Sequence, residues 1–272
     1  MTWGGVLRLP NGAENDSLLF IDHETAVLGR WEVGDVDAPL DEIVLNVCNF
    51  VPYLEVSTNG SPPVVELVDQ EWVITLVQLA DARDRLQQRK STGGGTVTHV
   101  AVLRTIEGSS FSWNQAKDVM IGFGHFLRWA AGDRVPVLLP VGFNSGRRLI
   151  EHWGDPQRSL GKSALRWFSA HHPETLAETW PGFIERWSDL RWREGLTVAT
   201  ELFSVAHHGL PLEIRILLSQ SALEVISWQW LTLVDGLEET TIDDKNADWR
   251  IRRMLNGIGV PIEIPASLGA LT

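Results

Sequence analysis

The sequence predicts an α+β protein, in which an N-terminal antiparallel β-rich domain precedes a C-terminal α-helical bundle. Up to about residue 107, apolar and polar residues alternate in short runs bounded by turn residues, as they do in strands. After residue 111 the apolar residues recur with the helical period of about 3.6. Ten of the 13 Trp also lie after residue 112. We therefore expect a β-rich sheet or sandwich domain over residues 1–110 and a helical bundle domain over residues 111–272.

The first part of the chain contains seven expected strands, which Asn-Gly and Pro-Pro turns punctuate. They are residues 6–9, 18–21, 25–28, 43–50, 64–68, 72–79 and 97–105. Residues 79–90 have high helix propensity and form either a helix or an excursion between two strands. Residues 91–95 (STGGG) are expected to form a loop. They do not predict a phosphate-binding loop, because no Lys-Ser or Lys-Thr follows them.

The helical part opens with a capping box, since Ser112 stands three residues before Gln115. An amphipathic helix follows, and Gly132 is placed to end it as a C-cap. Residues 135–143 (VPVLLPVGF) are apolar and contain two prolines, so they are expected to add a strand or to lie across the bundle. Residues 144–173 are rich in Gly, Arg, His and Trp and predict an irregular connection.

The longest apolar helical pattern spans residues 212–234 (LEIRILLSQSALEVISWQWLTLV). Its apolar residues cover most of the helix circumference, which predicts a position in the middle of the bundle. Polar residues interrupt it and argue against a membrane-spanning helix. One of them, Glu224, is expected to pair with a cation or to cap a neighbouring backbone rather than to act as a buried functional acid. The other expected helices are residues 174–192 with a break at Pro181-Gly182, residues 194–207, and a helix that follows Asp243-Asp244, runs to about Asn256 and is closed by Gly257.

Composition narrows the function classes. The chain has 272 residues and a formal net charge of −12, which argues against electrostatic wrapping of nucleic acid, so RNA as a partner has no support from charge. Cys48 is the single cysteine, which rules out an intramolecular disulfide and a cysteine-based zinc site. The first residues lack the pattern of a secretory signal, and no apolar run reaches 18 residues. We expect a cytoplasmic protein without a membrane segment.

Known catalytic and cofactor motifs are absent from the sequence. It contains no G-x-S-x-G, H-E-x-x-H, Walker A or Rossmann glycine pattern. The pairs His171-His172 and His207-His208 do not predict metal sites, because adjacent side chains on a helix point about 100° apart. Trp180, Trp187 and Trp192 have the spacing of core residues rather than of a base-stacking surface. We therefore expect neither a cofactor nor a bound metal.

A family resemblance rests on three segments that follow the β-rich part. They are FSWNQAKDVMIGFGHFLRWAAGDRVPV, PLEIRILLSQSALEVI and GVPIEIP. This arrangement resembles uncharacterised bacterial proteins with a C-terminal HEPN-like helical domain, akin to the ApeA-type anti-phage proteins. In that family a ribonuclease motif, with Arg, a polar residue and then His, begins a final helix. The chain ends at Thr272, before such a helix, so the resemblance implies an incomplete HEPN-like bundle.

The resemblance directs attention to Arg and His at the spacing R-x4-H. Arg147 and His152 have this spacing, with Arg148 at the position where the family has a polar residue. Arg166 and His171 have it too, with Trp167 at that position, and we interpret both matches as chance. In HEPN-type cleavage, which uses no metal, His would act as acid or base and Arg would stabilise the phosphorane.

These observations leave three hypotheses for the function. The leading one is a non-catalytic interaction or sensing protein of the HEPN-like class, with a link to phage defence implied by the resemblance. A missing final helix would leave an apolar groove for a protein partner or for self-association. The second is a metal-independent ribonuclease, or a truncated copy of one, with Arg147, Arg148 and His152 as weak catalytic candidates. The third is a small-molecule- or carbohydrate-binding β-domain on a helical scaffold. Whether the chain is an enzyme stays open, and the absence of known catalytic motifs favours a non-enzymatic protein.

Overall fold

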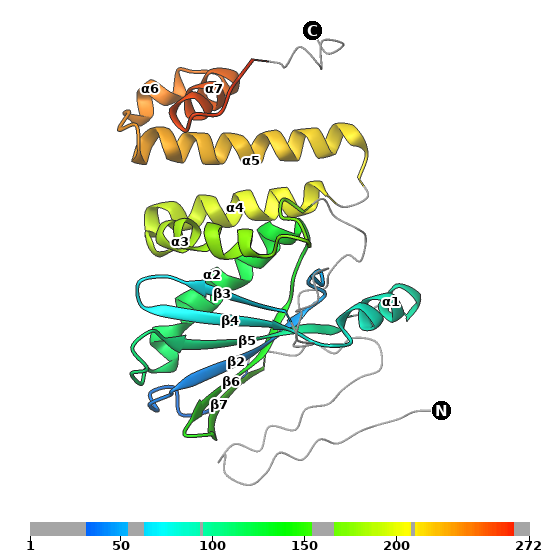
Figure 1. Cartoon of the computed structure of the whole chain (residues 1–272). Coiled ribbons are helices and arrows are strands. Elements are labelled where there is room, and N and C mark those ends of the chain that lie inside the picture. Colours follow the sequence, from blue (N-terminus) through cyan, green and yellow to red (C-terminus); the bar gives the residue numbers. More distant parts are fainter. Residues whose placement is uncertain (1–30, 54–62, 93–94, 154–165, 208–209, 264–272) are drawn as a thin grey trace.

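The computed structural model describes residues 31–53, 63–92, 95–153, 166–207 and 210–263. Within these ranges the chain forms a seven-stranded antiparallel sheet and layers of helices stacked on one side of it (Figure 1). The strands are β1 (Trp31–Gly34), β2 (Glu42–Cys48), β3 (Val64–Val68), β4 (Trp72–Gln78), β5 (Val97–Thr105), β6 (Val137–Asn144) and β7 (Arg147–Trp153). The helices are α1 (Ala82–Thr92), α2 (Trp113–Ala131), α3 (Glu174–Ser188), α4 (Leu190–Ala206), α5 (Leu212–Leu233), α6 (Glu239–Asp243) and α7 (Ala247–Gly257).

The sheet has the strand order β1-β7-β6-β2-β5-β4-β3. Alternate residues of its central strands, such as Ile43, Leu45 and Val47 of β2, are buried, because successive side chains of a strand point to opposite faces. Their buried face shares one hydrophobic core with α2, whose Phe123 and Phe126 are fully buried. The core therefore lies between the sheet on one side and α2 and α3 on the other, since Leu176, Trp180 and Phe183 of α3 belong to the same cluster.

The predicted α+β fold class is confirmed. Strands β3 and β5 occupy the predicted residues, and β2 and β4 agree with their predictions to within two residues at either end. The expected strands at 6–9, 18–21 and 25–28 lie outside the described residues. The domain boundary between residues 110 and 111 stays a prediction. Strands β6 and β7 follow that position in the chain and pair within the same sheet as the earlier strands.

Residues 144–173 were expected to be irregular, and this is wrong for β7. Ser145 and Gly146, with φ of 50° and 74°, form the tight turn of a β-hairpin that joins β6 to β7. Ile150 of β7 is fully buried, which ties this strand to the core. The polar residues around the turn concealed the strand, since only one of its seven side chains is fully buried. The expectation that residues 135–143 add a strand is confirmed by β6.

The capping signals of α2 are confirmed. The Ser112 side chain accepts a hydrogen bond from the Gln115 amide, and the Gln115 side chain accepts one from the Ser112 amide. Gly132 ends the helix with φ of 62°. Helix α3, in contrast, runs unbroken through Pro181, so the predicted break there is wrong. Packing of the buried Trp180 beside the proline outweighs its missing hydrogen bond, and the chain turns at Asp189 instead.

Helix α5 forms at the predicted residues, but its expected position in the middle of the bundle holds only for its C-terminal half. It packs against α4 along one side, and α6 and α7 cover its C-terminal half (Figure 1). Its buried residues are Ala222, Ser227, Gln229 and Leu231, all in that half or next to it. The predicted pairing of Glu224 with a cation is confirmed by Arg250, 3.5 Å away. None of the described helices combines the length and apolar character needed to cross a bilayer.

The helical layer is fixed on α2 at Gly122. A Cβ atom at Gly122 would lie 2.6 Å from Cδ1 of Trp187, the last tryptophan of α3. This contact leaves no room for a side chain, whereas a Cβ at Gly124, half a turn along, would have its nearest neighbour at 3.9 Å. Packing therefore requires a glycine at position 122 but leaves room for a small side chain at position 124.

We predict that Gly122→Ala lowers the free energy of unfolding by about 1–3 kcal/mol, because the indole of Trp187 must move to admit the methyl group. Gly124→Ala is the matched control on the same helix, and it should raise stability by about 0.5–1 kcal/mol through helix propensity. Guanidinium unfolding of both variants measures the difference. Equal stabilities would show that the Trp187 contact does not constrain α2.

Candidate functional site

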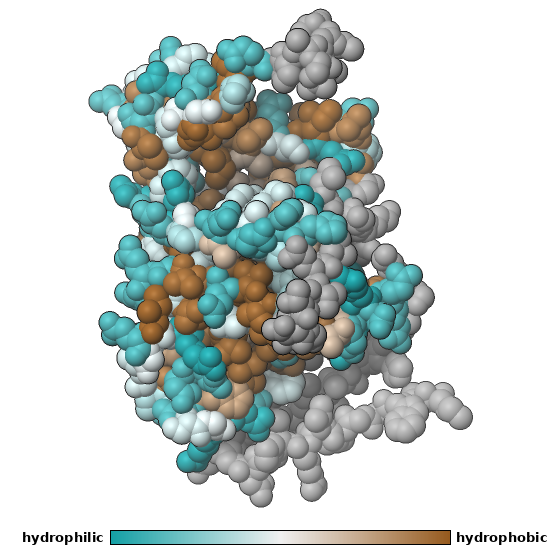
Figure 2. Space-filling view, viewed as in Figure 1, coloured by the Kyte–Doolittle hydropathy of each residue, from teal (hydrophilic) through white to brown (hydrophobic). Residues whose placement is uncertain are grey.

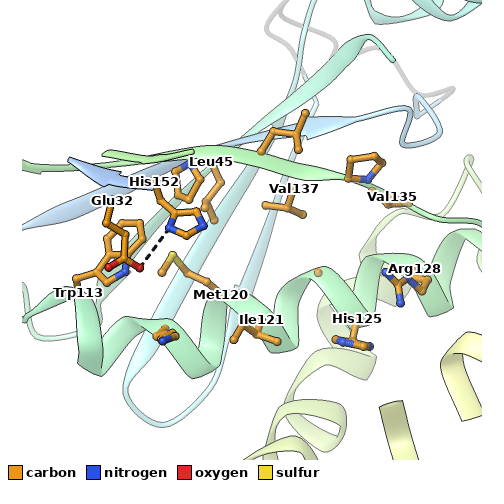
Figure 3. Close-up of a pocket in the computed structure, with 15 residues that line it drawn as sticks. Glu32, Leu45, Trp113, Met120, Ile121, His125, Arg128, Val135, Val137 and His152 are labelled. Atoms are coloured by element: carbon orange, nitrogen blue, oxygen red, sulfur yellow. Dashed lines mark ion pairs between the residues drawn. The ribbon is translucent and has the colours of Figure 1, made fainter. Parts of the chain in front are cut away.

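A cavity of about 270 Å³ opens between the sheet and α2, and we call it the sheet–α2 pocket (Figure 3). Strands β1, β2, β6 and β7 contribute to one wall, and helix α2 forms the other. Its ionisable lining residues are Glu32, Lys117, His125, Arg128 and His152. Glu32 and His152 lie at one end of the pocket and His125 and Arg128 at the other, and apolar side chains such as Met120 and Ile121 lie between them.

One end of the pocket is built on the pairing of β1 with β7. The register places Glu32 directly opposite His152, and Nδ1 of His152 lies 3.4 Å from a carboxylate oxygen of Glu32. The His152 side chain is 13% exposed, and its ring stacks on Trp113 of α2 with 5.9 Å between the centroids. The strand pairing and the stacking together hold this imidazole in place.

The other end of the pocket belongs to α2 and is supported by α4. The hydroxyl of Thr200 donates to the carbonyl of Thr197, so it accepts a hydrogen bond from Nδ1 of His125, 3.2 Å away. Burial and the neighbouring Arg128 charge lower the pKa of His125 to about 4, which keeps its imidazole neutral at neutral pH. Arg128 forms an ion pair with Glu201 of α4.

The structure separates the residues suggested by the R-x4-H spacing. His152 faces the pocket, whereas Arg147 is exposed at the start of β7 and Arg148 forms an ion pair with Glu151 at 2.6 Å. Four residues of a strand span about 13 Å along the backbone, and the ion pair with Glu151 engages the Arg148 side chain away from His152. The catalytic assignment of these residues stays a prediction. Arg166 and His171 lie in the connection to α3, and neither lines the pocket.

Sequence reasoning missed the other charged residues of the pocket. Glu32, Lys117 and Arg128 come from segments far apart in the chain, and no local motif joins them. One signal was available. Lys117, Ile121, Gly124 and Arg128 recur at helical spacing on one face of α2, and a glycine inside a helix is a costly choice unless space is needed.

A second hollow runs between the helices. A cavity of about 700 Å³ lies between α3, α4 and α5, and a neighbouring one of about 430 Å³ lies between α4 and the start of α5. The two cavities share His207, Ser219 and Leu223, so we treat them as one groove, the α4–α5 groove. Its lining is mainly apolar, and its permanently charged lining residues, Arg186 and Arg215, are both cations.

The N-terminal half of α5 is apolar and exposed on both of its flanks. Along the groove, Leu212, Ile216 and Leu223 are 46–63% exposed. On the opposite flank, Ile214 and Leu217 are 43% and 62% exposed. Figure 2 shows apolar side chains gathered over this end of α5, at the upper right of the molecule.

Comparison with known proteins identifies two matching families. Residues 35–163 match the YopA central domain, and residues 189–272 match the YopA C-terminal domain. A curated relative is the SPbeta prophage-derived uncharacterized protein YopA of Bacillus subtilis (strain 168), which is 23% identical over 201 residues. These residues make up 72% of this chain, and the chain spans about half the length of the relative (46%). No solved structure matches the chain.

These matches correct the family expected from the sequence. The similarity is to YopA domains, and the expected HEPN-like, ApeA-type relationship is wrong. The first match spans β2 to β7 together with α2, and the second spans α4 to α7. The sheet–α2 pocket is therefore formed almost wholly by the central-domain match.

The lowered pKa of His125 predicts a loss of stability in acid. Between pH 6.5 and about pH 4, His125 is protonated in the unfolded chain but stays neutral in the folded protein. The free energy of unfolding therefore decreases by at most about 1.4 kcal/mol for each pH unit by which the pH is lowered. His99, whose pKa burial lowers to about 3, contributes in the same direction. His125→Gln should flatten this dependence in guanidinium unfolding, and exposed His172→Gln should not. Identical slopes for both variants would contradict the assignment.

Proposed function

We propose that this chain is a non-catalytic interaction protein that binds a helix of a partner protein in the α4–α5 groove. The observation that carries the proposal is the apolar exposure on both flanks of the first half of α5. Fully burying one Leu or Ile side chain contributes roughly 1.5–3 kcal/mol. A partner that covers five such side chains gains several kilocalories per mole, and exposed apolar patches of this kind mark interaction surfaces.

Length and charge indicate the kind of helix that fits. The groove follows α5 from Leu212 to Ile226, a rise of about 21 Å, which matches about four turns of a docked helix. Arg186 and Arg215 supply its permanent charges, so a partner helix with acidic residues beside its apolar stripe complements it.

Two other occupants fit the surface less well. A small apolar molecule would fill the groove and leave Ile214 and Leu217 exposed on the opposite flank of α5. A second copy of the chain would bring its own groove cations against these, and each copy carries a formal net charge of −12.

Similarity to a protein described as prophage-derived supports a prophage origin for this chain.

Catalysis is not part of the proposal. Ribonuclease chemistry would need a cation and an imidazole at one phosphate, and the ion pair with Glu151 engages the Arg148 side chain away from His152. The correction of the family also removes the argument for a link to phage defence.

Three labelled helical peptides with the same leucine face and a Glu, Gln or Lys polar face test the proposal. In fluorescence anisotropy we expect the acidic peptide to bind most tightly, with an affinity that falls as salt screens the groove cations. Ile216→Ser should weaken binding by about tenfold or more, because it removes buried apolar area. Ile106→Ser, an equally apolar exposed position next to β5, is the matched control.

Equal affinities for the three peptides, or equal loss in both variants, would contradict a groove that selects an acidic helix. Light scattering of the unliganded protein adds a second reading. A dimer that Ile216→Ser converts to a monomer would identify a second copy as the occupant and would overturn the partner-helix proposal.

A further inference from the structure

We propose that the sheet–α2 pocket binds a small amphiphilic anion, with a carboxylate or phosphate group on an apolar body. This site is separate from the α4–α5 groove and does not depend on the proposed partner helix. Three independent features of the pocket support it: a glycine that packing does not require, a strained strand along the opposite wall, and a lysine without a counter-charge among the described residues.

The glycine is Gly124, in the interior of α2. Glycine destabilises a helix interior relative to alanine, so its presence calls for a reason. Gly122 has one, because Trp187 lies where its side chain would be. A Cβ at Gly124 would meet only Cγ2 of Val137, at 3.9 Å, which is an ordinary contact. Packing therefore admits a side chain at Gly124, and what the glycine provides is open space in the pocket.

The strained strand is β6, on the opposite wall. Its pairing with β2 shifts register between Val44 and Asn46, and Leu139 stands in this bulge with φ of 46°. A leucine rarely adopts this left-handed conformation, and such bulges are common beside binding sites. The residues on either side, Leu138 and Pro140, both line the pocket. The bulge therefore shapes the wall that faces Gly124.

The charge argument concerns Lys117. Of the permanently charged lining residues, Glu32 lies with His152 and Arg128 pairs with Glu201. Lys117 has no carboxylate within ion-pair distance among the residues that the structure describes. A ligand that complements this site carries negative charge, and a carboxylate or a phosphate meets that requirement equally.

The apolar part of the ligand follows from the middle of the pocket. Lys117 and Ile121 are one turn apart on α2, and the Met120 side chain extends from the same helix toward the sheet (Figure 3). An anion held by Lys117 therefore extends its body over Ile121 and Gly124 toward Leu138. A cavity of about 270 Å³ suits a body about the size of one aromatic ring.

Calorimetry with phenyl phosphate, benzoate and benzyl alcohol tests this inference. The two anions distinguish phosphate from carboxylate, and the alcohol is a neutral ligand with the same ring. We expect at least one anion to bind about tenfold or more tightly than the alcohol, because Lys117 makes a charge-assisted hydrogen bond to it. Lys117→Gln should remove that advantage, and Gly124→Leu should abolish binding by filling the pocket.

Lys245→Gln, which makes the same charge change beside Trp249, is the control for Lys117→Gln and should leave anion binding unchanged. Ile216→Ser should also leave it unchanged, which separates this site from the groove. The inference is overturned if neither anion binds the folded wild-type protein, if the alcohol binds as tightly, or if Lys117→Gln retains full anion affinity. Because Lys117→Gln keeps the helix intact, the test stands even where Gly124→Leu fails to fold.

Discussion

The close contact between Trp187 and Gly122 sets the geometry of the whole helical layer. The Trp187 indole lies against the bare backbone of α2, donates a hydrogen bond to the carbonyl of Asp118 at 3.1 Å, and stacks on His125. Arg193 covers the outer face of the ring and pairs with Asp118. Trp187 lies at the end of α3 and Arg193 at the start of α4. Their contacts with Gly122 and Asp118 therefore hold the turn between α3 and α4 against α2. The position of the groove follows from it.

Helix α2 also forms a common wall between the two proposed sites. His125 lines the sheet–α2 pocket, and its hydrogen-bond partner Thr200 lines the α4–α5 groove. One turn along, Arg128 lines the pocket and its neighbour Trp129 lines the groove. A shift of α2 against α4 would therefore alter both sites together. The two sites differ in the chemistry of their lining, but both depend on the position of α2.

Local signals in the sequence were sufficient to predict most of the helices and strands, but not which other elements pack against them. The capping box at Ser112 and the alternation in β5 depend on residues a few positions apart, so they could be predicted. Burial of α5 could not be predicted, since it depends on which elements cover the helix. Trp230 packs closely against Gly257 of α7, whereas Ile216 is 56% exposed and no described helix covers it in the same way. The pattern of strands followed by apolar helices is shared by unrelated families, which is why the expected family was wrong. His152 was singled out by a spacing whose two arginines point elsewhere, and its real partner, Glu32, is set by strand register.

Charge has a particular role in a molecule this acidic. The net charge of −12 repels anions at long range, and salt screens that repulsion beyond about 8–10 Å. The cations of the two sites, Lys117 and Arg128 in the pocket and Arg186 and Arg215 in the groove, therefore act only at short distance. Attraction between charges cannot supply most of the binding energy under these conditions, so apolar burial must supply it while the cations orient the ligand. The groove has the composition that this division requires, with a large apolar surface and few charges, whereas the lining of the pocket is polar and apolar in similar measure.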